Sequence, residues 1–307
     1  MNGEVMTTIT ECVPDGYRGP ADNIEVAVFD AVKKYQFRSR RRKRQKESVA
    51  KWLRNKRESV KKLRVYLKTY FCSGRDHYVV LTYGREPKNT EAVYKDAELF
   101  IRSLRRKCRK KGIRKLYWLY IVERGTENGR FHIHLIANEA VPYGFISKSW
   151  GHGKVLPGKV PTSAKRLHKL SSYCRKDDTF AEHIEGMHGW RSSKNLKEPK
   201  TEHDAKLIHQ EQLNAMVTGN GTVNMDMVYA VMKKLFPGYI VVHAGAVVNP
   251  YMGSPHLTVM LQRVEVAERA EAEERTEKEQ TRQRYESAFG AYVENLSVEQ
   301  QSLFDVI

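Results

Sequence analysis

Two histidines that alternate along a predicted strand are the first candidates for chemistry in this chain. Residues 131–135 read Phe-His-Ile-His-Leu, so the apolar side chains point to one face of an extended chain and the imidazoles of His132 and His134 point to the other. Two imidazoles on one face of a rigid strand are well placed to share one metal ion. The alternative is a half-buried strand whose two histidines face water, and the strand taken alone favours that interpretation.

A carboxylate on the preceding strand, Glu123, is the candidate third ligand. Asn128-Gly129, between two runs rich in aromatic and β-branched residues, predicts a β-hairpin. A two-residue turn there places Glu123 opposite His134, whereas a four-residue loop over 126–129 places it opposite His132. Because directly opposed residues share a face, both registers bring the carboxylate to the histidine face. A three-residue loop would turn it away.

A tyrosine on a predicted helix, from about Thr162 to Asp177, is the candidate nucleophile. Tyr173 lies on the flank of the apolar stripe, and Lys176 follows one turn later on the same side. Without context, such a tyrosine is usually a packing residue whose hydroxyl faces water. A phenol with an ordinary pKa of about 10 is also a poor nucleophile at neutral pH. Attack on a phosphate therefore needs a metal-polarised substrate and nearby positive charge, which the metal site and Lys176 would supply.

The whole chain carries a large excess of basic residues. Its 307 residues include 54 Lys and Arg against 36 Asp and Glu, which gives a formal net charge of +18 at pH 7. Such an excess favours a polyanionic partner, nucleic acid first and an anionic membrane surface second. No apolar run approaches the roughly 20 residues that span a bilayer, so we expect no membrane insertion.

The cysteines and the N-terminus predict a cytoplasmic protein. Cys12, Cys72, Cys108 and Cys174 are scattered without C-x-x-C spacing, which fits a reducing compartment and gives no support to a zinc knuckle or a disulfide scaffold. The first six residues lack the basic and then apolar order of a secretory signal.

Basic stretches are the candidate contacts to a phosphate backbone, which would give salt-dependent affinity without sequence readout. One is the run 38–44, which precedes a predicted helix; its alternatives are a solvated face, a flexible arm or a localisation signal. Another is the C-terminal half of the predicted helix 90–111, whose charges also suit the helix dipole. The candidate DNA-contacting residues are Arg40, Arg41, Arg42, Lys43, Arg44, Arg105, Arg106, Lys110, Arg191 and Lys194.

Hydrophobic periodicity and turn residues predict the remaining elements. Residues 1–22 are expected to be irregular, and a helix is expected from about Asn23. A helix from 90 to 111 should be capped by Thr90 and ended by Gly112. The other predicted elements are a helix within 49–70, a strand over 77–83, a turn and short strand at 150–155, an extended stretch over 187–203, a helix over 225–236, strands over 239–248 and 256–261, and a charged helix from 265 to about 289.

The order of these features resembles a known family. The buried strand Val79-Val-Leu-Thr-Tyr83, the His-Ile-His strand at 132–134 and the helical Tyr173-x-x-Lys176 follow one another as in the HUH endonucleases. The likeness is strongest to replication initiator proteins of small single-stranded-DNA phages and rolling-circle plasmids. The segments 150–155 and 190–199 also resemble the surroundings of the tyrosine helix in that family, and the likeness covers residues 77 to 200 approximately.

The resemblance implies an α/β (α+β) fold with a nuclease domain built on a central antiparallel sheet and packed helices. His132 and His134 would match the paired ligands of a divalent ion, Mg²⁺ or Mn²⁺, with Glu123 as a candidate for the third. Mg²⁺ prefers oxygen ligands, so Mn²⁺ is equally compatible with these residues. Tyr173 would match the nucleophile and Lys176 its helical partner, and attack would leave a 5′-phosphotyrosyl link and a free 3′-OH that primes synthesis.

These implications predict a replication initiator that nicks and transfers DNA strands in rolling-circle replication. Its expected partner is single-stranded or origin DNA in a bacterial host cytoplasm, with a host helicase and polymerase as further candidates. Phage members often carry two tyrosines, but Lys169 and Asp177 occupy the positions of a second one here, so this is a single-tyrosine version. The alternatives are a relaxase or single-strand transposase with the same chemistry, and a non-catalytic basic nucleic-acid-binding protein.

The expected organisation has four parts. They are a basic helical N-terminal region over 1–74, an HUH-type nuclease domain over 75–205, a small mixed appendage over 206–262 and a charged helical tail over 263–307.

Overall fold

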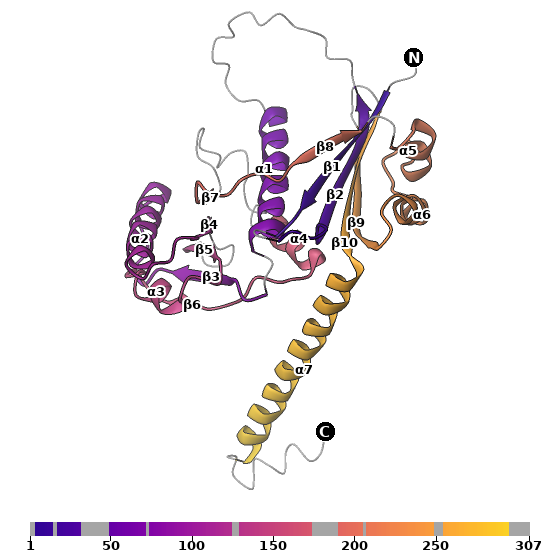
Figure 1. Cartoon of the computed structure of the whole chain (residues 1–307). Coiled ribbons are helices and arrows are strands. Elements are labelled where there is room, and N and C mark those ends of the chain that lie inside the picture. The colour runs from indigo at the N-terminus through magenta and orange to yellow at the C-terminus, as the bar shows by residue number, and fades with distance from the viewer. Residues whose placement is uncertain are drawn as a thin grey trace, which may run out of the picture. The chain divides into compact units, whose positions relative to one another are not determined.

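The computed structural model describes residues 4–14, 17–31, 49–71, 74–124, 129–173, 190–204, 207–248 and 254–294 (Figure 1). Within these ranges the chain forms two five-stranded antiparallel sheets and seven helices, which confirms the predicted α+β class. The chain divides into two compact units, residues 1–263 and 264–307, and the first unit holds both sheets. The four expected parts, with boundaries at 74, 205 and 262, stay a prediction.

The sheet that carries the candidate metal ligands, called sheet B below, has the strand order β6-β3-β5-β4-β7. The hairpin of β4 and β5 lies near its centre, as the sequence predicted. In its register Glu123 is opposite His132, which corresponds to the four-residue loop of the two alternatives. The strands are β3 (His77–Thr82), β4 (Trp118–Arg124), β5 (Phe131–Ala137), β6 (Val155–Leu156) and β7 (Trp190–Ser192).

One face of sheet B is covered by α2 (Thr90–Lys110) and the short α3 (Tyr143–Ser147). The apolar stripe of α2 packs against the side chains of Phe131, Ile133 and Leu135, the face of β5 that lacks the histidines. The predicted cap was wrong by one residue, because the Asn89 side chain accepts the amide of Ala92 at 2.9 Å. Gly112 follows the helix at φ +77°, a conformation that favours glycine after a helix end.

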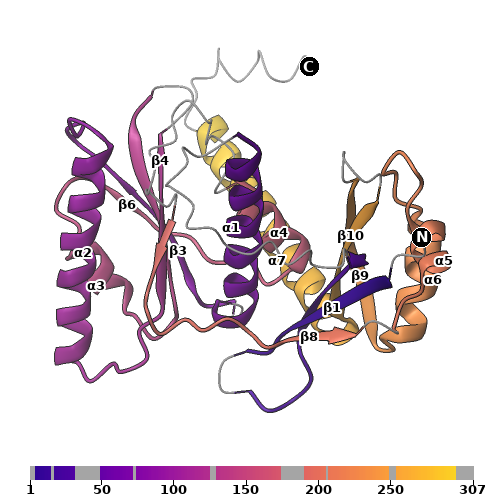
Figure 2. The same cartoon turned by 90° about the horizontal axis from the view of Figure 1, so that it is seen from above.

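The opposite face of sheet B is covered by α1 (Val49–Tyr70) and α4 (Ala164–Tyr173), as Figure 2 shows. Leu63 and Leu67 of α1 and Leu167 of α4 share one apolar cluster with side chains of β4 and β5. These strand residues have the same parity as Glu123, His132 and His134. The two helices therefore lie on the same side of the sheet as the candidate ligands.

The second sheet, sheet A, has the order β8-β1-β2-β10-β9. Its strands come from distant parts of the chain, because β1 (Glu4–Cys12) and β2 (Asn23–Ala31) pair with β8 (Thr201–Asp204) and β10 (Pro255–Arg263), and β9 (Tyr239–Val248) pairs with β10. The helices α5 (Gln210–Met216) and α6 (Met225–Leu235) contribute to the apolar core on one of its faces.

Two predictions for the N-terminal part were wrong. Residues 4–12, expected to be irregular, form β1, and residues 23–31, expected to begin a helix, form β2. The apolar residues of β2 were grouped at helical spacing, but Ile24, Val26 and Val28 alternate into the core of sheet A. A strand that is buried on both faces has few polar interruptions, so its periodicity does not distinguish it from a short helix.

A buried ion pair attaches α1 to sheet A. The guanidinium of Arg64 donates two hydrogen bonds to the carboxylate of Glu25 on β2, at 2.9 and 2.7 Å. Lys68, one turn later on α1, is also completely buried, and burial lowers the pKa of its amine. Since α1 presents its leucines to sheet B, this helix contacts both sheets of the first unit.

The helix α4 is also held by sheet A. The buried side chain of Gln262 on β10 accepts the amide of Ala164 at 3.3 Å and donates to the carbonyl of Thr162 at 3.4 Å, so a distant strand supports the start of the helix. Further along, the rings of His168 on α4 and His243 on β9 stack with their centroids 4.3 Å apart.

We expect this histidine stack to make stability depend on pH. Burial, assisted by His243, Arg64 and Lys68, lowers the pKa of His168 from 6.5 to about 4. Between these two values the unfolded chain binds more protons than the folded one, so the free energy of unfolding should fall as pH falls from 6.5 towards 4. His168→Phe keeps a ring without a titrating group and should lose less stability in that window. Urea unfolding of both proteins at several pH values tests this, and parallel pH profiles would contradict it.

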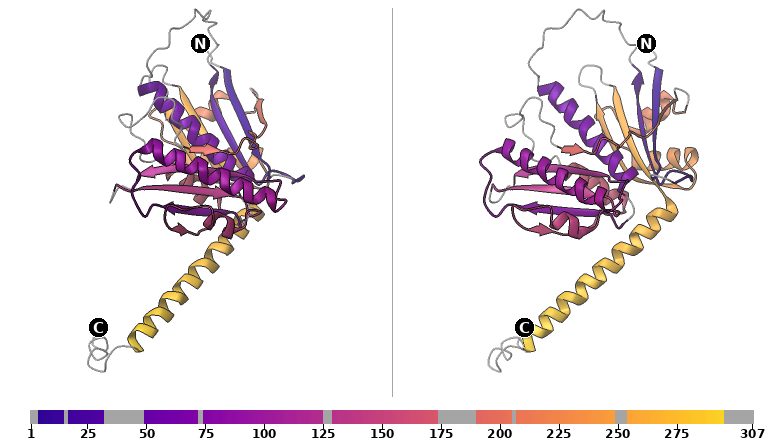
Figure 3. Two further views of the ribbon diagram at one scale, coloured as in Figure 1. Left: turned by 90° about the vertical axis from the view of Figure 1, so that its left-hand side faces the viewer. Right: turned by 60° about the vertical axis from the view of Figure 1, so that its left-hand side comes forward.

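The second compact unit contains α7 (Val264–Glu294), a single long helix in Figure 3. The sequence predicted a charged helix over 265–289, and this is confirmed. Among the described residues no helix combines the length and the apolar character needed to cross a bilayer.

Candidate metal centre

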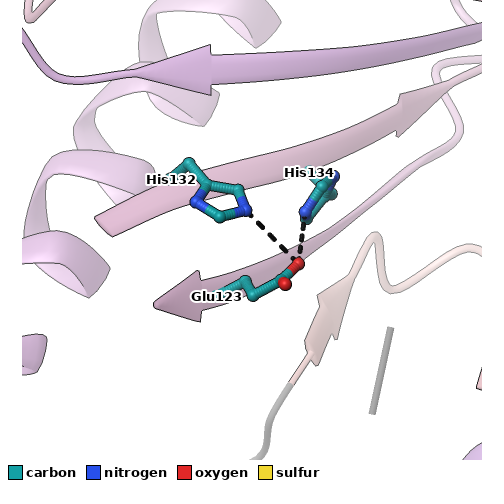
Figure 4. A group of neighbouring side chains, drawn as sticks. All are labelled: Glu123, His132 and His134. Atoms are coloured by element: carbon teal, nitrogen blue, oxygen red, sulfur yellow. Dashed lines mark hydrogen bonds and ion pairs between the residues drawn. The ribbon is translucent and has the colours of Figure 1, made fainter. Parts of the chain in front are cut away.

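Three side chains of the central hairpin converge on one point (Figure 4). The Nε2 atom of His134 lies 2.5 Å from Oε2 of Glu123, and Nε2 of His132 lies 3.3 Å from the same oxygen. One ligand atom from each residue lies within 4.8 Å of the other two. Two imidazole nitrogens and a carboxylate oxygen at these separations fit a divalent cation. The alternative of two histidines that merely face water is therefore not supported by the geometry.

Burial differs among the three residues in a way that leaves one side accessible. The side chain of His134 is 5 % exposed and that of Glu123 12 %, whereas that of His132 is 20 % exposed. The cluster thus lies at the margin of the covered face, where a bound ion would have protein on one side and room for a further ligand on the other.

The carboxylate of Glu123 is ionised at neutral pH. Partial burial opposes its ionisation, but hydrogen bonds from His132 and His134 outweigh that effect and hold the pKa of the carboxyl well below its usual range. A carboxylate that keeps its negative charge in this position is suited to bind a cation.

Tyr78 on β3 orients the more buried imidazole, and sequence reasoning did not find it. Its hydroxyl lies 2.7 Å from Nδ1 of His134, and the two rings stack with 12° between their planes. A phenol hydroxyl can donate or accept, so it can hold the ring while Nε2 either donates to Glu123 or presents its lone pair to a metal. Outer partners of this kind fix the tautomer of a metal-binding histidine.

Replacing Tyr78 with phenylalanine should weaken metal binding without changing the ligands. Loss of an outer hydrogen bond typically lowers metal affinity about 10- to 100-fold, so we expect the dissociation constant for Mn²⁺ to rise by that factor. Tyr239→Phe is the matched control, because it removes a hydrogen bond of the same 2.7 Å length, to the carbonyl of Ala21, in sheet A. Calorimetric titration with Mn²⁺ tests this, and equal affinities in the two variants would contradict it.

The two candidate catalytic residues on the tyrosine helix are described only in part. Tyr173 is the last residue of α4, and its backbone continues the helix that packs on the ligand face of sheet B. Its side chain and Lys176 lie outside the described part of the chain, as does the predicted basic run with Arg40, Arg41, Arg42, Lys43 and Arg44. Their predicted roles stay predictions.

The remaining predicted DNA-contacting residues are not near the metal cluster. Arg105, Arg106 and Lys110 are exposed on α2, which covers the other face of sheet B. Arg191 on β7 is also on that face, where its guanidinium lies over the ring of Tyr94 and pairs with Glu98. Lys194 is exposed in the turn after β7.

One comparison with known proteins gives a match. Comparisons with curated proteins and with solved structures give none. Residues 76–178 match the family model of the replication-associated proteins of the ORF2 type. The matched stretch contains both strands of the metal-ligand hairpin and the whole of α4. The match supports a protein of the replication-initiator type, similar over this stretch to the replication-associated proteins.

Proposed function

We propose that this chain is a metal-dependent DNA-nicking and strand-transfer enzyme that initiates rolling-circle replication. The observation that carries the proposal is the convergence of Glu123, His132 and His134 within a stretch that matches replication-associated proteins. The proposed relatives are the HUH endonucleases of small single-stranded-DNA phages and plasmids. A relaxase or a single-strand transposase would use the same chemistry on other substrates.

The proposed reaction divides its work between the hairpin and α4. His132, His134 and Glu123 would hold the ion, Mg²⁺ or Mn²⁺, which when bound polarises the scissile phosphate. Tyr173 attacks the phosphorus, a bond forms between the phenolic oxygen and phosphorus, and the bond from phosphorus to the 3′ oxygen breaks. The phenol loses its proton and the 3′ oxygen gains one, which leaves a 5′-phosphotyrosyl link and a 3′-OH primer. Lys176 contributes positive charge beside the reacting phosphate.

The length and location of α4 support this assignment. The chain approaches α4 from the His77 end of sheet B, where the amide of Val160 donates to the carbonyl of Asp76. Ten residues of helix rise about 15 Å. Along β5, the five steps from Ala137 back to His132 span roughly 17 Å. A helix of this length is sufficient to bring a phenol from one end of the ligand face to the other.

The test of the proposal is a covalent adduct. Purified protein is incubated with Mn²⁺ and single-stranded oligonucleotides that tile the DNA encoding the chain, and denaturing electrophoresis separates protein from protein–DNA species. We expect an adduct with the wild-type protein and none with Tyr173→Phe. Tyr229→Phe, which alters a half-exposed tyrosine on α6, is the control and should form the adduct normally.

Three other outcomes would decide against the proposal or change it. An adduct that persists in Tyr173→Phe would show that another residue is the nucleophile. Salt-dependent binding with no cleavage, insensitive to EDTA, would favour the non-catalytic nucleic-acid-binding protein. Transfer of the bound end to any target, with no preference for one origin, would favour a transposase.

A further inference from the structure

A row of basic side chains runs along the outer face of α2. The exposed residues Arg102, Arg105, Arg106, Arg109 and Lys110 recur at the three- and four-residue spacing of one helix face. The buried stripe of α2 lies on the other side of the helix. Residues 99–115 contain nine Lys and Arg and no Asp or Glu. We call the five exposed residues the α2 stripe.

Contacts within the protein do not account for the stripe. In the part of the chain that the structure describes, none of its five residues forms an ion pair. Lys107, in the same helix, differs because its ammonium donates to the carbonyl of Lys148 and the hydroxyl of Ser149, both at 2.9 Å. The helix dipole favours cations only in the last turn, so it does not explain Arg102, Arg105 and Arg106. Like charges at this spacing repel one another, and a bound polyanion would remove that repulsion.

Sheet B separates the stripe from the metal cluster. α2 packs on the face that carries Phe131, Ile133 and Leu135, and the metal ligands project from the other face (Figure 2). The outer side of α2 lies at least one helix diameter, about 10 Å, behind the sheet. A strand bound at the metal cluster therefore cannot contact the stripe without passing around an edge of the sheet.

We infer that the α2 stripe is a second nucleic-acid site, which binds the phosphate backbone of duplex DNA while the metal centre acts on a single strand. The inference rests on the proposed function for the second half of that statement. Arginine guanidinium groups match phosphate oxygens in a planar, bidentate geometry, and such contacts hold DNA without reading its sequence.

The chemistry of the stripe favours duplex DNA over its alternatives. Sites for single strands combine cations with aromatic side chains on which bases stack, but both aromatic residues of α2, Tyr94 and Phe100, are buried. Helices that bind membranes insert an apolar face, and the apolar face of α2 is used in the protein core. Cations alone suit a backbone whose bases are already stacked and paired.

The test compares two variants that lose the same charge. Arg102→Gln/Arg105→Gln/Arg106→Gln removes three members of the stripe, and Arg18→Gln/Lys233→Gln/Lys234→Gln removes three exposed cations elsewhere in the first unit. Binding of a short duplex of arbitrary sequence is measured in EDTA over a range of KCl concentrations. For the stripe variant we expect the slope of log affinity against log salt to become shallower by about 2 to 3, and affinity at about 0.1 M KCl to fall roughly 100-fold. The control should change by only a few-fold.

A second arm separates this inference from the proposed function. At saturating single-stranded oligonucleotide and Mn²⁺, the stripe variant should cut as well as wild type, which also shows that it is folded. His134→Ala should bind the duplex normally without cutting. An equal loss of duplex binding in both triple variants, or a parallel loss of cutting in the stripe variant, would overturn the second site. Cutting by His134→Ala would instead overturn the metal-dependent nicking and leave the stripe intact. Should the triple variant be unstable, Arg105→Gln alone should still reduce the salt slope by about 0.9.

Discussion

Replacing His134 with alanine is expected to abolish metal binding at the cluster and to lower the nicking rate by at least about a thousandfold. A metal ion contributes several kcal/mol of transition-state stabilisation in such reactions, and about 4 kcal/mol corresponds to that factor. His134 is the most buried of the three ligands, and both of its ring nitrogens have partners, Tyr78 on one side and Glu123 on the other. A water molecule in the space left by alanine would not reproduce that geometry.

His203→Ala is the matched control, since His203 is exposed on β8 in the other sheet. It should bind Mn²⁺ and cut DNA like the wild type. Single-turnover cleavage and calorimetric Mn²⁺ titration measure the two effects separately. Undiminished cutting by His134→Ala, or by the wild type in EDTA, would show that the cluster does not serve the reaction.

The ligand set was predictable because it depends on short-range geometry. Alternation along β5 places His132 and His134 on one face, whatever the rest of the chain does. The position of Glu123 needed only the parity of one hairpin loop, and the sequence reduced the choice to two registers. Of these, the structure has the register with Glu123 opposite His132.

Tyr78 was not predictable in the same way. It comes from β3, which pairs with β5 across a sequence distance of more than fifty residues, and nothing in the pattern of either strand fixes their register. Placed next to Val79 in an apolar run, Tyr78 resembles a packing residue. Only the pairing of Val80 with His134 and of Tyr78 with Ile136 brings its hydroxyl to the imidazole.

Sheet A was missed for a related reason. β1 is rich in threonine and has little apolar periodicity, and the partners of β1 and β2 at the far end of the first unit are separated from them by about two hundred residues. The inner face of this sheet carries polar groups such as Glu25, Gln262 and His243, which sequence patterning assigns to the surface. These groups are buried because α1 and α4 bring polar partners to them.

The free energy of unfolding should fall by about 3–5 kcal/mol when Glu25 is replaced with alanine, because this leaves two buried cations without their carboxylate. The side chain of Glu25 is 1 % exposed and that of its partner Arg64 9 %, and Lys68 beside them is completely buried. Urea unfolding monitored by circular dichroism measures the change. Glu58→Ala, an exposed position on α1, is the control and should change stability by less than about 0.5 kcal/mol.

A double variant tests whether the loss comes from unpaired charge or from an irreplaceable contact. Glu25→Leu/Arg64→Met substitutes apolar groups of similar size for the pair, and such replacements are often neutral or stabilising, so most of the stability should return. α1 contacts sheet A through this pair and sheet B through Leu63 and Leu67, so the helix couples the second sheet to the face that carries the metal ligands. If the double variant is as unstable as Glu25→Ala, the geometry of the pair itself, and not the desolvated charge, joins the two sheets.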